Sequence, residues 1–335
     1  MRQRKAATMI APRHGGLQDL GKRSLDAELR PPRLGLMHKT SQTPIRRDDW
    51  LGRAARQRQR LQSLVGDYVA ARRRGERDAV LEFLFEYYSF PPGRLERWSP
   101  SPSCALEGPL DGLDNSAFFR QDDEGLWSFD PTRLPQHRRR ALVWTLGLLR
   151  RSVAASPHFA CFGLHEWAMI ERDGSHRHHQ LPLRFPAADI ADLVARQGTS
   201  CTHYDAFRFF TSEAAPKNLH QTSRDTQEDF EQPACLHANM DLYKWASKLH
   251  PWIDGDLLLD CLEIALDCRR LDMQASPYDL SAQELAPVPV ETPQGREEYA
   301  RRQRQLMARA QVLRPRLAEA YTELLERMPE DETRH

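Results

Sequence analysis

Histidines and acidic residues stand close together at three places in the chain, a combination suited to acid–base or metal chemistry. The first pair interrupts an apolar run, where it is either part of a site or a core histidine with its partner. The other two occur in segments rich in polar and aromatic residues, and buried charges are costly unless they are paired. We predict that these last two segments line one pocket. The six candidate catalytic residues are His165 with Glu166, His203 with Asp205, and His237 with Asp241.

The spacing of these residues suggests how each segment would present them. If residues 200–210 form a strand, His203 and Asp205 share one face with two phenylalanines. If the chain is helical from Leu236, His237 and Asp241 are neighbours on one face. Both segments also carry rings for stacking on a flat ligand and groups for hydrogen bonding to it. These candidate binding residues are Tyr204, Phe207, Arg208, Asn239, Tyr243, Lys244 and Trp245.

Metal chemistry is an alternative use of the same residues. Two histidines and a carboxylate can hold non-haem iron, and three histidines can hold zinc. Spacing alone does not show that the three segments converge. The HExxH motif is absent, because His165 and Glu166 are followed by Trp-Ala-Met. Iron or zinc therefore stays open as a cofactor, with His165, His203, His237 and Asp241 as the alternative ligands.

Composition limits the classes of protein to consider. The chain has 335 residues and a net formal charge of +1, so no overall basic field marks it as a nucleic-acid binder. Basic residues are nevertheless in excess up to about residue 80, with an arginine run at 72–74. The six cysteines form no CxxC pair, which is typical of free thiols in a reducing cytoplasm. Neither a membrane span nor a secretory signal is expected, and no oligomeric state is predicted.

The elements that must position these residues are mostly helices. Residues 1–47 lack periodicity and suit a disordered basic arm, and residues 48–330 suit a single catalytic or binding domain. We predict an α+β fold, predominantly helical, with a small sheet. Its strands, 181–185 and 200–210, would flank a helix at 187–197 and form a parallel strand–helix–strand unit. Residues 99–134 are interpreted as a surface connection. The aromatic run at 83–98 is interpreted as core, with a ligand-facing wall as the alternative. The predicted helices cover 50–69, 78–88, 135–155, 236–249 and 257–273, and a last helix begins at 292–293.

Five segments resemble bacterial proteins that carry the label 3-methyladenine DNA glycosylase. They are residues 83–89 (FLFEYYS), 162–169 (FGLHEWAM), 201–211 (CTHYDAFRFFT), 235–246 (CLHANMDLYKWA) and 271–279 (LDMQASPYD). The resemblance spans about residues 50–315. It implies a hydrolase of DNA repair that removes an alkylated purine. The Gly-rich hairpin of helix–hairpin–helix glycosylases does not precede Asp205 or Asp241.

Base excision would give these residues definite roles. A glycosylase stacks its flipped base on aromatic rings and stabilises the sugar cation with a carboxylate. We expect Asp205 to be that carboxylate, with Asp241 in reserve. The rings of Tyr204, Phe207, Tyr243 and Trp245 would stack, Asn239 would bind a base edge, and Lys244 and Arg208 would bind phosphate. A non-enzymatic protein that binds nucleic acid or another protein is the remaining alternative.

Overall fold

The computed structural model describes residues 44–171 and 181–328, all of which belong to one compact unit that begins at Gln42. The predicted basic arm, 1–47, therefore lies almost entirely outside the described residues. The first helix, α1, spans Arg47–Arg73. None of the helices described is both long and apolar enough to cross a membrane.

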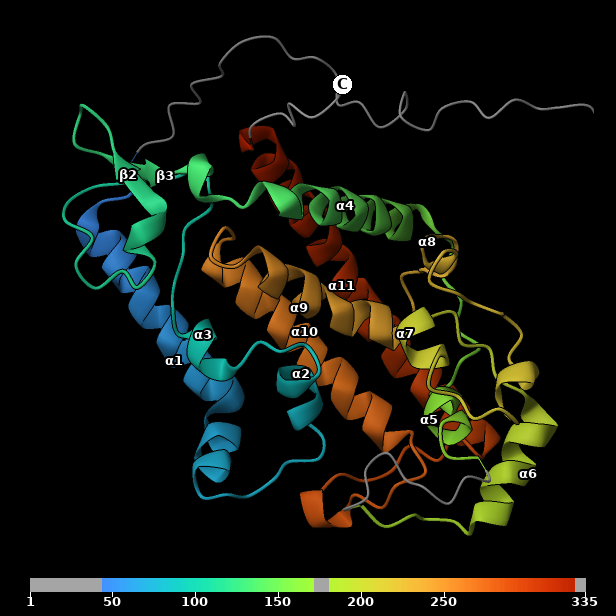
Figure 1. Cartoon of the computed structure of the whole chain (residues 1–335). Helices are drawn as coiled ribbons and strands as arrows, with labels where there is room; N and C mark the ends of the chain where they lie inside the picture. Colours follow the sequence, from blue (N-terminus) through green and yellow to red (C-terminus); the bar gives the residue numbers. More distant parts are fainter. Residues whose placement is uncertain (1–43, 172–180, 329–335) are drawn as a thin grey trace, which may run out of the picture. The chain divides into compact units, whose positions relative to one another are not determined.

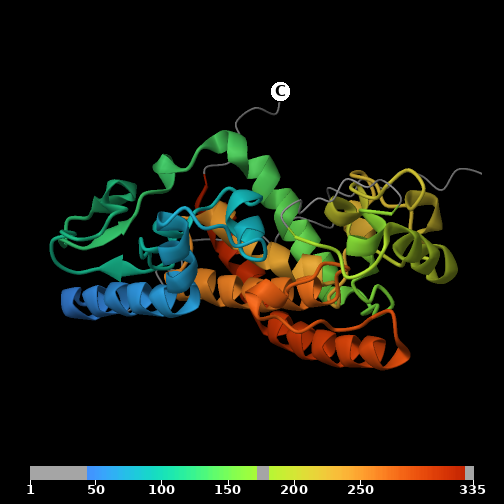
Figure 2. The ribbon, with the colours of Figure 1, turned by 90° about the horizontal axis from the view of Figure 1, so that it is seen from below.

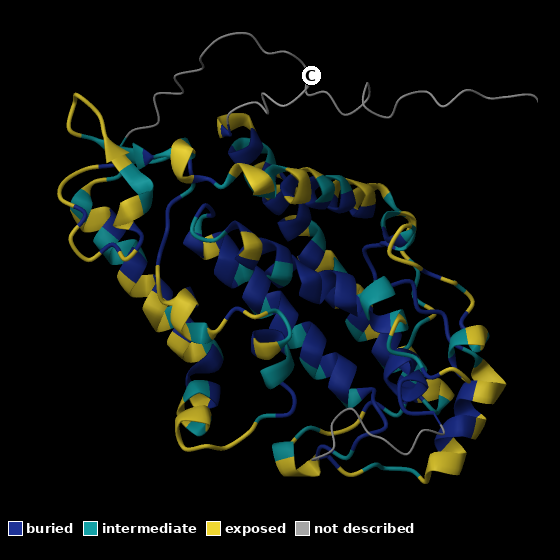
Figure 3. Cartoon of the chain, in the orientation of Figure 1, coloured by how far each residue is buried: buried dark blue, intermediate teal, exposed yellow. Residues whose placement is uncertain are grey.

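Two helices lie side by side at the centre of the unit, α9 (Leu236–Leu249) and α10 (Gly255–Gln274) (Figure 1). The long helix α11 (Pro293–Arg327) packs on both, α4 (Arg139–Ala154) packs on α11, and α1 contacts α10. Burial is concentrated on the central pair (Figure 3). Because other elements surround it, α10 carries apolar residues over most of its circumference.

Local signals in the sequence explain where α10 and α11 begin. The side chain of Asp254 accepts hydrogen bonds from the backbone N–H groups of Asp256 and Leu257, which caps α10. Thr292 caps α11 in the same way through Gly295, and Pro293 occupies the first turn. The helix continues through Pro315 to Arg327.

Shorter helices surround the central pair, and several of them carry the candidate residues. They are α2 (Glu82–Glu86), α3 (Pro92–Leu95), α5 (Leu164–Ala168), α6 (Ala187–Gln197), α7 (Tyr204–Phe207) and α8 (Gln227–Phe230). Short 3₁₀ turns occur at 116–118, 131–133, 136–138, 215–217 and 281–283.

A small antiparallel sheet lies over the first half of α1 (Figure 2). Its strands are β1 (Ala105–Leu106), β2 (Phe119–Gln121) and β3 (Trp127–Phe129), in the order β1-β3-β2. Leu106 pairs with Trp127, and Phe119 pairs with Phe129. Beneath it is a second, smaller core, which includes Trp50 and Trp98 with ring centroids 6.4 Å apart.

The predicted class, predominantly helical with a small sheet, is confirmed, but the sheet was expected in the wrong place. The three strands lie within residues 99–134, the region interpreted as a surface connection. The predicted strand–helix–strand unit keeps only its helix, α6. Residues 204–207 are helical because the N–H groups of Phe207 and Arg208 donate to carbonyl groups of the preceding turn. The expected strand at 181–185 keeps one isolated bridge, Leu183 with Tyr278, and a second bridge, Thr199 with Asn218, lies just before the expected strand at 200–210.

Candidate functional site

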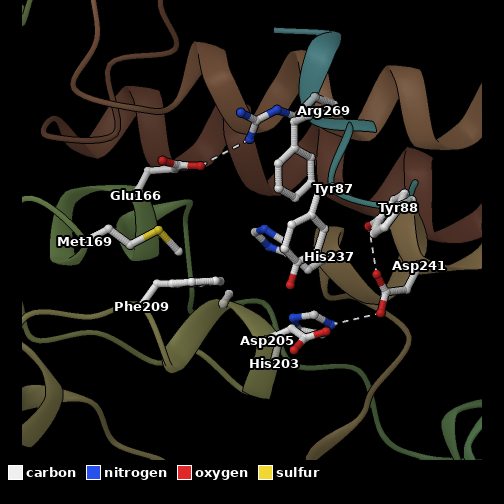
Figure 4. Close-up of a pocket in the computed structure, with 12 residues that line it drawn as sticks. Tyr87, Tyr88, Glu166, Met169, His203, Asp205, Phe209, His237, Asp241 and Arg269 are labelled. Atoms are coloured by element: carbon white, nitrogen blue, oxygen red, sulfur yellow. Dashed lines mark hydrogen bonds and ion pairs between the residues drawn. The ribbon is translucent and has the colours of Figure 1, made fainter. Parts of the chain in front are cut away.

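A pocket opens where α2, α5, α7, α9 and α10 meet (Figure 4). Aromatic, acidic and histidine side chains share the lining. The lining residues are Phe83, Tyr87, Tyr88, Glu166, Met169, His203, Asp205, Ala206, Phe209, His237, Asp241 and Arg269.

Aromatic rings form the walls of this pocket. Phe83 and Tyr87 are one helical turn apart, and their rings stack with centroids 4.9 Å apart and planes 12° from parallel. Figure 4 shows Phe209 and Met169 on the other side, facing Tyr87 across the open space. We call the space between these two sides the ring slot.

Asp241 is the buried carboxylate of the pocket, and its two oxygens are already engaged. Tyr88 donates its hydroxyl to Oδ1 at 2.7 Å, and Lys244 donates to Oδ2 at 2.9 Å. His203 Nε2 lies 3.4 Å from Oδ2. Burial alone would raise the pKa of Asp241, but Lys244 and His203 hold that pKa well below its ordinary range. Asp241 is therefore an ionised anchor, with little capacity left for a ligand.

Asp205 is the more accessible carboxylate. Its side chain is 20% exposed, against 2% for Asp241. Lys244 bridges the two acids and donates to Asp205 Oδ2 at 2.8 Å. Arg208 Nε lies 3.2 Å from Oδ1, and the same guanidinium donates to the hydroxyl of Tyr87. Asp205 is thus oriented by two cationic side chains while it lines the pocket.

Beneath the pocket lies a fully buried charged cluster. Arg269 donates to Asp272 Oδ2 at 2.9 Å and to Glu166 at 3.2 Å. The other oxygen of Asp272 lies 2.7 Å from His165 Nε2. Burial would raise the pKa of Asp272, but His165 and Arg269 hold it well below its ordinary range. Burial would lower the pKa of His165, but Asp272 and Cys161 raise it well above its ordinary value.

Three imidazoles connect this cluster to the pocket. The ring of His237 contacts the edge of His165, with centroids 4.5 Å apart, and stacks on His203 at 5.2 Å. Burial lowers the pKa of His237 well below its ordinary value, so this ring is neutral. No other described residue hydrogen bonds to it. His237 therefore presents an unengaged imidazole at the floor of the pocket.

The structure brings together the predicted catalytic residues. Five of the six line the pocket, and His165 lies directly behind His237. Of the predicted binding residues, Lys244 and Arg208 touch the lining carboxylate Asp205 but are not themselves among the lining residues.

The remaining predicted binding residues do not line the pocket, which corrects the expectation that they contact a ligand there. Tyr243 is buried and donates to the carbonyl of Phe90, and Trp245 packs against Trp144. Asn239 accepts a hydrogen bond from Arg314 of α11. The reason is that α9 is central, so its other faces contact the core. Phe207 packs on Phe210, and Tyr204 is also absent from the lining.

The sequence analysis also missed several residues of the site. The aromatic run at 83–98 was interpreted as core, although Phe83, Tyr87 and Tyr88 of this run line the pocket. Arg269 and Asp272 were not singled out, because they occur in the strongly apolar pattern of α10. Their spacing of three residues on a buried face was the available signal.

Comparisons with protein-family models, curated proteins and solved structures find no match to this chain. The resemblance to the bacterial proteins labelled as glycosylases therefore remains an expectation. Functional inference depends on the geometry of the pocket itself.

Proposed function

We propose that this protein is a cytoplasmic DNA base-excision hydrolase that removes an alkylated, positively charged purine. One observation carries the proposal: a single pocket combines a slot between aromatic rings with an accessible carboxylate, Asp205. Rings can stack on a flipped base, and a carboxylate can stabilise the cationic sugar that forms as the base leaves. None of the six cysteines forms a disulfide in the described part of the chain, which agrees with a reducing compartment.

The residues that line the slot include more acids than bases, which favours a cationic ligand. Three carboxylates line the pocket, Glu166, Asp205 and Asp241, against one lining guanidinium, Arg269. Behind the lining, Lys244 is shared by two of these acids and Arg208 pairs with Asp205. An N-alkylated purine carries a positive charge, which adds about 0.5–2 kcal/mol of attraction to aromatic rings. A neutral base of the same shape would lack this contribution.

In the proposed reaction water attacks the sugar carbon C1′ and the bond from that carbon to the base breaks. The cationic base takes the bonding electrons and leaves as a neutral molecule. Asp205 faces the developing positive charge on the sugar, and the proton from water passes to this carboxylate and then to solvent. Lys244 and Arg208 hold Asp205 in place for this role.

The ring slot predicts that Tyr87→Ala weakens the binding of an N-methylated purine about 5-fold to 100-fold. The reason is the loss of stacking, which contributes about 1–3 kcal/mol per base. Titration calorimetry with 7-methylguanosine, a stable cationic nucleoside, would measure the affinity. Tyr87→Phe is the matched control, since it keeps the ring and loses only the hydroxyl that accepts from Arg208. Guanosine tests the charge preference, and equal affinity for both nucleosides, or none for either, would contradict the proposal.

The DNA partner would require basic residues near the pocket. Arg72 lies 3.6 Å from Glu86, which places the end of α1 beside α2 and its ring wall. Replacing Arg72, Arg73 and Arg74 with alanine is expected to reduce the salt slope of DNA binding by about 1 to 3, as phosphate contacts are lost. Affinities for one duplex at several salt concentrations would show this. Equal slopes would mean that the arginine run does not contact phosphate.

A further inference from the structure

Three residues at the floor of the pocket have the composition of a metal site that base excision as proposed does not use. They are His165 of α5, His237 of α9 and Asp272 of α10. One possible ligand atom from each lies within 4.8 Å of the others. Their exposed fractions are 2%, 7% and 0%. The packing of three helices therefore brings two imidazoles and a carboxylate close enough together to bind one ion.

This donor set suits a divalent transition metal. Two histidines and one carboxylate hold non-haem iron, and also occur at catalytic zinc sites, which keep a coordination position open. His237 lines the pocket, so an ion bound to it would be next to the ligand space. A buried all-protein structural zinc site would instead have four ligands and no such opening.

Two of the three residues also make outer contacts of the kind that orient metal ligands in known metal sites. The second nitrogen of His165, Nδ1, lies 3.3 Å from the Cys161 thiol, and the second oxygen of Asp272 accepts from Arg269. Outer contacts of this kind hold ligating imidazoles and carboxylates in position. The ligand atoms themselves would then be His165 Nε2 and Asp272 Oδ1, which lie 2.7 Å apart.

Polar capacity in the same region is left unused by the protein. The His237 imidazole accepts no hydrogen bond from, and donates none to, any other described residue. Glu166 is 4% exposed, and its Oε2 has no hydrogen-bond partner among the described residues. Buried polar groups of this kind are typically hydrogen bonded or bound to metal.

We propose that His165, His237 and Asp272 bind one divalent transition-metal ion, iron or zinc, at the floor of the pocket. Asp272 replaces the carboxylate expected from the sequence. Asp241 and His203 are outside the site, because Tyr88 and Lys244 engage Asp241 and His203 faces it. The inference rests on the cluster and not on the proposed function.

The test is elemental analysis of the full chain, purified without a metal-binding tag. We expect close to one iron or zinc per chain, and at least a tenfold lower content in His165→Asn, His237→Asn and Asp272→Asn. His203→Asn is the matched control and should keep its metal. His237→Asn is the decisive variant, because no hydrogen bond to a described residue is lost. Thermal unfolding of the chelator-treated native chain, with and without added Zn²⁺ or anaerobic Fe²⁺, gives a second readout that needs no variant.

Each outcome decides for or against the site. Metal in the native chain that disappears from the three variants, with a raised Tm on adding the ion back, supports it. A metal-free native chain whose Tm does not respond to either ion overturns it. Metal retained in His237→Asn, or lost equally from His203→Asn, overturns the ligand assignment. If the metal-free native chain releases the base, the proposed function is supported and the metal site is rejected. If the chain binds the metal but releases no base, the metal site is supported and the proposed function is rejected.

Discussion

Asp205→Asn is expected to lower the rate of base release by about 100-fold or more while the chain stays folded. Loss of a positioned acid–base group typically costs 10² to 10⁴ in rate. The substitution keeps the size of the side chain but removes the charge that would face the sugar cation. Single-turnover release of 3-methyladenine from alkylated DNA would measure the effect.

Two comparisons make this result interpretable. Asp260→Asn is a matched control, because Asp260 pairs with Arg60 and Arg316 on the surface and does not line the pocket. Thermal unfolding should show that both variants are folded. A normal rate with Asp205→Asn would remove this carboxylate from the mechanism. If the native chain itself releases no 3-methyladenine, base excision at this pocket is contradicted.

The parts of the fold that were predicted correctly depend on signals close together in the sequence. The bounds predicted for α9, 236–249, are those of the structure. The helix predicted at 257–273 is α10, and the side chain of Asp254 just before it does cap the helix. Residues 200–210 were expected to form a strand, yet the turn after His203 satisfies its own backbone groups. A segment this short therefore could not be assigned to a strand or to one helical turn from its sequence alone.

The same limit applies to the site. His203 with Asp205 and His237 with Asp241 were found because each pair is local. The contact between His165 and Asp272 joins residues 107 positions apart and depends on how α5 meets α10. The rings at Phe83 and Tyr87 have the composition of a core, and only the packing around α2 shows that they face a pocket. The sequence therefore showed which neighbouring residues could act together, but it did not show which distant segments meet at the site.

Arg269→Met is expected to lower the free energy of unfolding by about 3–5 kcal/mol, the usual cost of removing one partner of a buried ion pair. Arg269 is buried and pairs with both Asp272 and Glu166. Methionine would keep much of its contact with the ring of Phe83 but would leave two buried acids without this partner. Urea unfolding would measure the change. The surface control is Arg301→Met, which loses only an exposed pair with Glu298 and should cost less than about 1 kcal/mol.

Two further variants separate charge from packing in this prediction. In the triple variant Arg269→Met, Glu166→Gln, Asp272→Asn the unpaired charges are gone, so part of the lost stability should return. If the proposed ion binds, added Zn²⁺ should also reduce the cost of Arg269→Met, because the ion would supply positive charge beside Asp272. Zinc should give no such recovery once His237 is also replaced. A cost as small as that of Arg301→Met would show that water reaches the cluster, and would weaken the case that its charges are held for a metal.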